Sequence, residues 1–275
     1  MVQPDKSTVF KPNPAPVLLV DDNATNRKVG SILLERLGLE WHVATNGLEA
    51  LEAIRAKQFS VILMDCHMPE MDGFETTVAI RQLEEQSNTY TPIIAVTALV
   101  MDGDRERCIA AGMDDYIPKP IDVDVLRIKL NQWMQTSIDF NGHKLASKLR
   151  THTELSLLEP APIRLSELEE FYGEEALDEI LSLFYKNTED MLERIAFYLT
   201  EQNTRAVAGL AHEVKASSAA LGATQMARDC LCVEQAVGQQ DWVEARATYV
   251  SLRKSFDYLQ QFIGSSRDSK NLVER

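Results

Sequence analysis

The chain has 275 residues, of which 45% are hydrophobic and 25% are charged, as in folded proteins and unlike disordered ones. This length allows two ordinary domains, each with its own core. The formal net charge of -14 argues against a nucleic-acid-binding surface, which needs a basic face, and no apolar run reaches the roughly 18 residues of a membrane span.

Residues 1–16 contain four prolines and lack the apolar core of a signal peptide, so we expect an extended leader or the end of a linker. The cysteines are too few and too scattered for a disulfide scaffold. They are Cys66, Cys108, Cys230 and Cys232. Cys230 and Cys232 have no second ligand pair at the spacing of a zinc site, so we expect thiols in a reducing cytoplasm.

Between residues 17 and 135, short apolar runs alternate with segments of helical periodicity. The expected strands are Val17–Val20, Trp41–Ala44, Val61–Met64, Ile93–Val96 and Tyr116–Ile117. The expected helices are 26–37, 48–57, one starting near Gly73, 104–111 and 123–134. Apolar strands that alternate with helices are typical of a parallel sheet covered on both faces. The pattern predicts an α/β doubly wound fold with a five-stranded parallel sheet.

The pattern changes near residue 137, after which long amphipathic stripes follow one another with short connections. The stripes are 174–200, 205–221, 225–237 and 242–263. They predict an all-α antiparallel four-helix bundle. We therefore expect a first domain at 17–135, a linker at 136–162, a second domain at 163–264 and a frayed tail at 265–275.

Aspartates follow two strands of the first half. Asp21 and Asp22 come directly after the first strand, and Asp65 follows the third. These strands are neighbours in a doubly wound sheet, so the carboxylates should converge at one edge, where a cation would relieve their repulsion. Oxygen ligands favour a hard ion such as Mg²⁺, which assists phosphoryl transfer. For a single aspartate the alternative is a helix N-cap, a role that Asp22 or Asn23 could fill.

The fourth and fifth strands bring a hydroxyl and an ammonium to the same edge. Thr97 ends the fourth strand and is followed by the small Ala98. Lys119 follows the fifth strand and can neutralise a transferred phosphoryl group as a point charge. A cis peptide bond between Lys119 and Pro120 would help to turn the lysine inward.

In their order and spacing, four motifs of residues 17–134 resemble those of the receiver (response regulator) domain family. They are Asp21-Asp22, the run from Asp65 to Gly73, Val96-Thr97-Ala98 and Lys119-Pro120. The resemblance implies a flavodoxin-like fold in which Asp65 is the phosphate acceptor.

The same resemblance implies a role for each neighbouring residue. Mg²⁺ would be bound by Asp22, Asp65 and the backbone carbonyl of His67, and Asp21 would hold a metal-bound water. Thr97 and Lys119 would contact phosphoryl oxygens, and Tyr116 would turn inward as Thr97 is drawn to the phosphate. The side chain of His67 is expected at the surface without a role.

The second candidate site is His212, which lies next to the expected core stripe of its helix. Its helical neighbours are mostly small side chains. They are Ala208, Gly209, Lys215, Ala216 and, one turn further on, Ala219. Small side chains let another protein approach closely, a neutral imidazole is a good nucleophile, and Lys215 can offset charge on a phosphorylated ring. From the residues alone, a solvated histidine without a role is the alternative.

The segment around His212 resembles the motif of the histidine phosphotransfer (HPt) family over about residues 165–263. His212, Lys215, Ala216 and Gly222 occupy the positions of that motif, although the family often has glycine where Ala216 stands. The resemblance implies that His212 accepts and donates a phosphoryl group. His143 and His152 fall in the expected linker, where we expect them to be solvated.

Together the two resemblances imply a phosphorelay protein with Mg²⁺ as cofactor. Its partners would be an upstream sensor kinase and a downstream response regulator receiver, with no nucleic acid and no membrane contact by this chain itself. No ATP-binding glycine-rich loop occurs, so we expect no self-phosphorylation from ATP. We expect the C-terminal part of a hybrid sensor histidine kinase, located in the cytoplasm on its own or within a membrane-anchored kinase.

Three alternatives stay open. A free-standing receiver–HPt relay protein would carry the same motifs. An aspartate-nucleophile phosphatase would also use a strand-end aspartate and Mg²⁺, but it normally has a second acid two residues after the nucleophile, where this chain has His67. A response regulator with a DNA-binding output would need a basic recognition helix, which the acidic composition opposes.

Overall fold

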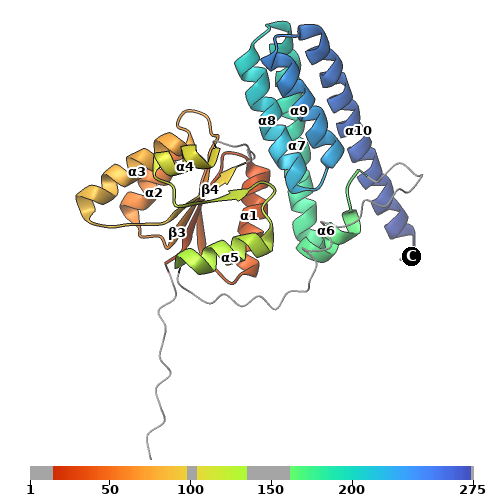
Figure 1. Ribbon diagram of the computed structural model, residues 1–275. Helices are drawn as coiled ribbons and strands as arrows, with labels where there is room; N and C mark the ends of the chain where they lie inside the picture. The colour runs from red at the N-terminus through yellow and green to blue at the C-terminus, as the bar shows by residue number, and fades with distance from the viewer. Residues whose placement is uncertain (1–14, 98–103, 135–161, 274–275) are drawn as a thin grey trace, which may run out of the picture.

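A computed structural model of the chain describes residues 15–97, 104–134 and 162–273. Within these ranges an α/β half is followed by an all-helical half (Figure 1). Ala98, His143 and His152 lie outside the described residues, as does the expected linker except for Pro162. Among the residues that are described, no helix is both long and apolar enough to cross a membrane, and no cysteine forms a disulfide.

The described strands of the first half form one parallel sheet in the order β2-β1-β3-β4-β5. They are β1 (Val17–Val20), β2 (Trp41–Ala44), β3 (Val61–Asp65), β4 (Ile93–Thr97) and β5 (Asp115–Pro118). The helices between and after them are α1 (Ala24–Arg36), α2 (Gly47–Ala56), α3 (Gly73–Ser87), α4 (Asp104–Ala111) and α5 (Val123–Met134). The predicted five-stranded doubly wound fold is confirmed. β1 pairs with β3 and Val20 lies opposite Met64, so the residues that follow both strands reach the same edge.

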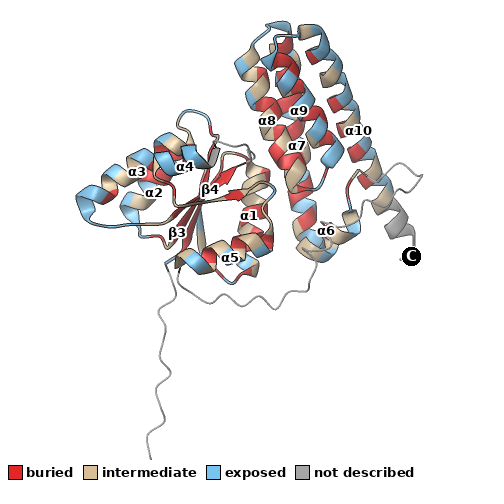
Figure 2. Ribbon diagram, viewed as in Figure 1, coloured by how far each residue is buried: buried red, intermediate tan, exposed pale blue. Residues whose placement is uncertain are grey.

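The sheet is buried on both faces because its central strands are apolar throughout. Every residue of β1, β3 and β4 is buried, as the red strands of Figure 2 show. Successive residues of β1 belong to different clusters of buried side chains: Val17 and Leu19 to one, Leu18 and Val20 to the other. This alternation is the two-residue period of a strand between two layers of helices.

The second half is built from long helices that pack side by side, which confirms the predicted all-helical bundle. They are α7 (Glu174–Thr200), α8 (Thr204–Ala220), α9 (Thr224–Gly238) and α10 (Trp242–Val273). Their buried stripes face one another, as the red inner surfaces of Figure 2 show. A short helix, α6 (Leu165–Tyr172), precedes them and was not expected as a separate element.

The expected frayed tail at 265–275 is wrong as far as Val273, because α10 continues to that residue. The hydroxyl of Ser266 donates a hydrogen bond to the carbonyl of Phe262 at 2.8 Å, and Arg267 forms an ion pair with Asp178 of α7. Helical hydrogen bonding can continue through polar residues that have no apolar stripe, and a prediction based on periodicity stops where the stripe stops.

The two halves are in contact. Helix α1 of the first half packs against α7 and α8 of the second, beside which it lies in Figure 1. One continuous cluster of buried apolar side chains includes Val29 and Leu33 of α1 together with Leu210 and Val214 of α8. The carboxyl ends of the strands therefore meet the helix that carries His212.

Candidate functional site

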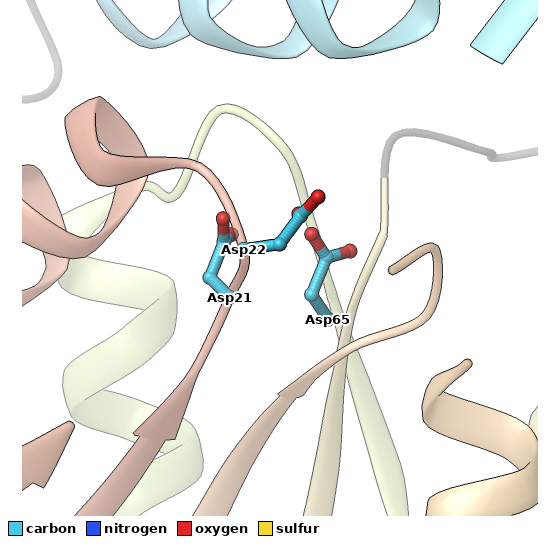
Figure 3. Close-up of side chains that lie close together, drawn as sticks. All are labelled: Asp21, Asp22 and Asp65. Carbon is cyan, nitrogen blue, oxygen red and sulfur yellow. The ribbon is translucent and has the colours of Figure 1, made fainter. Parts of the chain in front are cut away.

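Asp21, Asp22 and Asp65 lie together at the carboxyl ends of β1 and β3. Each offers a carboxylate oxygen, and these oxygens all lie within 4.8 Å of one another. In Figure 3 the carboxylates point away from the strands, toward a helix of the second half. The convergence that the sequence pattern predicted is therefore present.

The first turn of α1 leaves the side chain of Asp22 available. Asn23 is the N-cap, because its side-chain oxygen accepts hydrogen bonds from the backbone N–H of Thr25 at 2.9 Å and of Asn26 at 3.2 Å. Asp21 in turn accepts a hydrogen bond from the backbone N–H of Asn23 at 2.9 Å. Of the two N-cap candidates in the sequence, Asn23 fills the role.

Helix α3 begins directly against the backbone of Asp65. A Cβ atom on Gly73 would lie 2.1 Å from the carbonyl oxygen of Asp65, so only glycine fits there. Asp72 caps the helix in a capping box with Glu75, which fixes where α3 starts. The loop after β3 is thereby held close to the backbone of Asp65.

Lys119 completes the acidic cluster from the other side. Its Nζ donates hydrogen bonds to Oδ2 of Asp65 at 2.6 Å and to Oδ2 of Asp21 at 2.8 Å, and its side chain is buried. The peptide bond from Lys119 to Pro120 is cis. Within the described ranges, the three carboxylates of the acidic cluster therefore face the single ammonium of Lys119.

Two carboxyls of the cluster resist ionisation, chiefly because they are buried. Burial and the carboxylate of Asp21 raise the pKa of Asp65, against the opposing effect of Lys119. Burial and Asp21 also raise the pKa of Asp22 to about 6. Although burial works against it, the carboxylates of Asp21 and Asp65 raise the pKa of Lys119. Buried acids that resist ionisation in this way form a site that a divalent cation would stabilise.

Thr97 and Tyr116 lie on the neighbouring strands of the same edge. Thr97 is buried at the end of β4, and its carbonyl accepts a hydrogen bond from the backbone N–H of Lys119 at 2.7 Å. Tyr116 of β5 is half-buried, and Nζ of Lys129 lies 5.8 Å from the centre of its ring. Thr97 is therefore adjacent to the backbone that carries Lys119.

His212 lies on α8 against a carboxylate of α9. Its Nδ1 is 3.4 Å from Oε1 of Glu234, and Nζ of Lys215 donates a hydrogen bond to Oε2 of the same carboxylate at 2.5 Å. Oε1 is buried and forms no hydrogen bond of ordinary geometry within the described part of the chain. The ring nitrogen Nδ1 of His212 lies close to it and could donate one. Although burial alone would raise it, contacts with His212 and Lys215 hold the pKa of Glu234 below its ordinary value.

Glu234 was missed by the sequence analysis. The signal was present, since Glu234 stands between the buried residues Val233 and Val237 of the α9 stripe, where a charged side chain needs a partner. What the sequence does not reveal is that the partner is His212, which lies on a different helix.

The expected surface position of the His67 side chain is wrong. The centres of the His67 and His212 rings are 5.1 Å apart, and Nδ1 of His67 is buried. Burial and the neighbouring His212 lower the pKa of His67. The sequence could not show this contact, because it depends on how the bundle packs against the first domain.

The small side chains of α8 allow this helix to lie close to the acidic cluster of the first half. Ala216 and Ala220 line a cavity of about 20 Å³ together with Asp21 and Lys119, which leaves room for about one water molecule. Burial and the charge of Asp22 raise the pKa of Glu213 to about 7, so this α8 carboxyl also lies near the acidic cluster. The candidate sites of the two halves thus form one continuous region.

Comparisons with known proteins agree with both halves. The family model of the response regulator receiver domain matches residues 17–131, and that of the Hpt domain matches residues 179–268. The hybrid signal transduction histidine kinase B of Dictyostelium discoideum is 42% identical over 123 residues, which are 42% of this chain and 6% of that protein. The sensor histidine kinase GacS of Pseudomonas protegens is 39% identical over 133 residues, which are 48% of this chain and 14% of that protein.

Among solved structures, the receiver domain of the sensor histidine kinase PA1611 from Pseudomonas aeruginosa PAO1 is 36% identical, with a TM-score of 0.41. The match covers 45% of this chain and 99% of that domain, which was crystallised with a magnesium ion in its active site cleft. The chain spans only a small part of the curated relatives it matches, 6% and 14% of the two kinases above.

Proposed function

This chain joins a response regulator receiver domain to an Hpt domain, the arrangement of hybrid kinases, and from this premise we propose that Asp65 accepts a phosphoryl group and His212 passes one on. Phosphorelay signalling is the function of such a pair of domains, and relatives of the chain include hybrid signal transduction histidine kinases. The observation that carries the proposal for Asp65 is its carboxylate, buried between Lys119 and two further acids.

As the acceptor, Asp65 acts as a nucleophile toward phosphorus. Lys119 lies 2.6 Å from its Oδ2, where the ammonium offsets the negative charge of an incoming phosphoryl group. Thr97, at the end of β4, would contact a phosphoryl oxygen, and Tyr116 would follow its movement. The close packing of Gly73 on the backbone of Asp65 would help to keep this residue in place during the step.

The acidic cluster fits a magnesium ion by the chemistry of its donors. Asp22, Asp65 and the backbone carbonyl of His67 would hold the ion directly, and Asp21 would hold one of its waters. Oxygen ligands and an excess of buried negative charge favour a hard divalent cation. When bound, Mg²⁺ screens the charge of the phosphoryl group.

In the second domain, His212 is proposed to take up and donate the phosphoryl group through Nε2. Glu234 would accept a hydrogen bond from Nδ1–H, which keeps the proton on Nδ1 and leaves the lone pair of Nε2 free for attack on phosphorus. Lys215, hydrogen-bonded to Glu234, lies one helical turn away and would offset charge on the phosphorylated ring.

We propose the order sensor kinase histidine, Asp65, His212, and then the aspartate of another receiver. The upstream partner would be a sensor kinase and the downstream partner a response regulator. We further propose that the chain is the C-terminal part of a hybrid sensor histidine kinase, since its relatives of that kind are much longer than the segments matched.

Labelling with radioactive acetyl phosphate tests the proposal. With Mg²⁺, the wild type and His212→Gln should be labelled on Asp65, whereas Asp65→Asn should not. Omitting Mg²⁺ should strongly reduce the labelling. Transfer from the labelled wild type to a separate receiver should be lost in His212→Gln. Normal labelling of Asp65→Asn would disprove the acceptor assignment.

A further inference from the structure

We propose that His67 of the first domain and His212 of the second bind a divalent transition-metal ion such as Zn²⁺ between them. Imidazole is a preferred ligand of such ions, whereas the acidic cluster offers only oxygen ligands, which suit Mg²⁺. The two sites therefore favour different ions. The imidazole site goes beyond the proposed function, because phosphoryl transfer from Asp65 to a histidine does not itself require the ring of His67.

The two rings approach each other from different domains. Their centres are 5.1 Å apart and their planes are inclined by 49°. Two nitrogens bound to one tetrahedral Zn²⁺, each at about 2.1 Å, lie roughly 3.4 Å apart, which rings this close can reach. His67 lies between β3 and α3, and His212 lies on α8, so the site is complete only while the domains are docked.

His67 has a ring nitrogen that no other group uses. Its Nδ1 is buried and forms no hydrogen bond within the described part of the chain. A buried polar atom without a partner is costly, and a bound metal ion would satisfy it. The ring of Phe74 on α3 lies nearly perpendicular to the imidazole, with the ring centres 6.3 Å apart, and supports it from the first domain.

His212 is oriented as metal-bound histidines are. Its Nδ1 lies 3.4 Å from Oε1 of Glu234, so Nε2 is the nitrogen left for a metal ion. Histidines that bind metals usually donate the other ring N–H to a carboxylate, which fixes the tautomer and makes the bound nitrogen more basic. Glu234 is held in turn by Lys215, whose Nζ donates a hydrogen bond to Oε2 at 2.5 Å.

Two imidazoles leave positions around the ion for water. Within the described ranges, the acidic cluster is the one group of three or more potential ligands that converge, so no third side chain of this kind joins the two rings. We therefore expect weaker binding than at a structural zinc site with four protein ligands. Two protonated rings at this distance would repel each other, so the contact favours neutral imidazoles, which is the form that binds metals.

A metal ion at this site would block transfer through His212, and this consequence rests on the proposed function. The ion on Nε2 would occupy the lone pair that attacks phosphorus. It would also tie the second domain to the first beside Asp65, which is two residues before His67. Zn²⁺ should therefore inhibit the relay.

Calorimetric titration with Zn²⁺ tests the site in the full chain with saturating Mg²⁺. Cys232→Ser serves as the parent protein, because Cys232 is an exposed thiol and thiolates bind zinc. The parent should bind one more Zn²⁺ ion than His67→Ala or His67→Phe, the second of which keeps an aromatic ring that cannot bind metal. His42→Ala, which removes an exposed histidine of β2, is the matched control and should bind as the parent does. The same stoichiometry in all four proteins would overturn the proposal.

A further variant tests whether the ion bridges the domains. Nζ of Lys28 on α1 lies 2.5 Å from Oε2 of Glu179 on α7, so Lys28→Glu replaces an attraction between the domains with a repulsion. This variant, made in the parent, should bind Zn²⁺ about threefold more weakly, because undocking separates the two rings. Lys186→Glu, at an exposed position of α7, makes the same charge change outside this ion pair and should bind normally. An unchanged affinity in Lys28→Glu would overturn the bridging of the two domains.

Inhibition is measured as uptake of label by His212 from a separate labelled receiver. At about ten times the Kd for Zn²⁺, uptake should slow about tenfold in the parent. It should slow much less in His67→Ala, which also controls for zinc bound by the receiver. Equal inhibition of both proteins would overturn the inhibitory role of this site. If the parent takes up no label even without Zn²⁺, the proposed function fails, while the titration still decides the metal site.

Discussion

Nδ1 of His212 lies 3.4 Å from Oε1 of Glu234, a buried oxygen with no hydrogen-bond partner in the described ranges. This places an acceptor at the ring nitrogen opposite the proposed nucleophile. An acceptor at Nδ1 holds the proton there and orients the ring, so that Nε2 keeps its lone pair for attack.

The first prediction follows from this contact. Glu234→Ala should reduce transfer through His212 by at least about tenfold, which corresponds to about 1.4 kcal/mol of barrier. Glu234→Gln should retain more activity, because its amide oxygen can still accept from Nδ1. A time course of phosphoryl transfer to a separate receiver, with samples quenched at intervals, measures the effect. Glu244→Ala, at an exposed position of α10, is the control, and an equal loss in that variant would refute the role of Glu234.

A second prediction concerns the ion pairs of Lys119. Lys119→Met removes the buried ammonium from Asp21 and Asp65, and removing one partner of a buried pair typically costs about 3 kcal/mol of unfolding free energy. Urea unfolding in a chelator should show this loss. Added Mg²⁺ should stabilise the variant more than the wild type, since a cation replaces the lost charge.

Two results would contradict this expectation: an unchanged unfolding free energy in chelator, or the same Mg²⁺ increment in both proteins. Lys186→Met, which removes an exposed lysine of α7, is the matched control and should change neither quantity.

Most elements of the fold could be predicted because their periodicity is local. β1 at Val17–Val20, β2 at Trp41–Ala44 and α4 at Asp104–Ala111 have the predicted bounds, and the long helices of the bundle begin within one residue of their apolar stripes. The edge where Asp21 and Asp65 meet was also predictable, because strand order fixes which carboxyl ends are neighbours.

The features that the sequence analysis did not predict depend mostly on contacts between distant segments. Glu234 meets His212 through the packing of α9 on α8, and His67 meets His212 through the packing of two domains. Neither contact leaves a periodic trace in the sequence. Helix α6 was missed because its eight residues are too few to show an apolar stripe. The end of α10 was missed because its polar residues form no apolar stripe.

A third prediction tests the close approach of α3 to the acceptor. Gly73→Ala would place a Cβ atom 2.1 Å from the carbonyl oxygen of Asp65, and backbone must move to relieve the overlap. We expect a loss of about 3 kcal/mol in unfolding free energy and a marked decrease in Asp65 labelling. Chemical unfolding followed by circular dichroism measures the first effect.

The matched control is Gly264→Ala in α10. No atom lies within 4 Å of a Cβ built there, and alanine favours a helix interior by about 1 kcal/mol over glycine. This variant should therefore be slightly more stable than the wild type. A Gly73→Ala protein of wild-type stability would show that the loop after β3 can move away from Asp65 at little cost.

A fourth prediction uses the pKa of Glu213. Burial against the first domain and the charge of Asp22 raise this pKa from 4.5 to about 7, and undocking would return it toward the lower value. Between these values the docked form binds more protons than the undocked form. Docking should therefore be strongest at low pH and weaken as the pH rises through this window, after which Glu213 is ionised in both forms and the effect is constant.

Energy transfer between dyes measures this docking. One dye would be attached to Cys232, exposed on α9, and the other to a cysteine introduced by Glu52→Cys on α2. Saturating Mg²⁺ keeps Asp22 ionised, so that its titration does not contribute. The docking equilibrium should fall by about tenfold from low to neutral pH, and Glu213→Gln should remove most of that change because its amide does not titrate. An equal pH response in Glu213→Gln would assign the effect to another group of the interface.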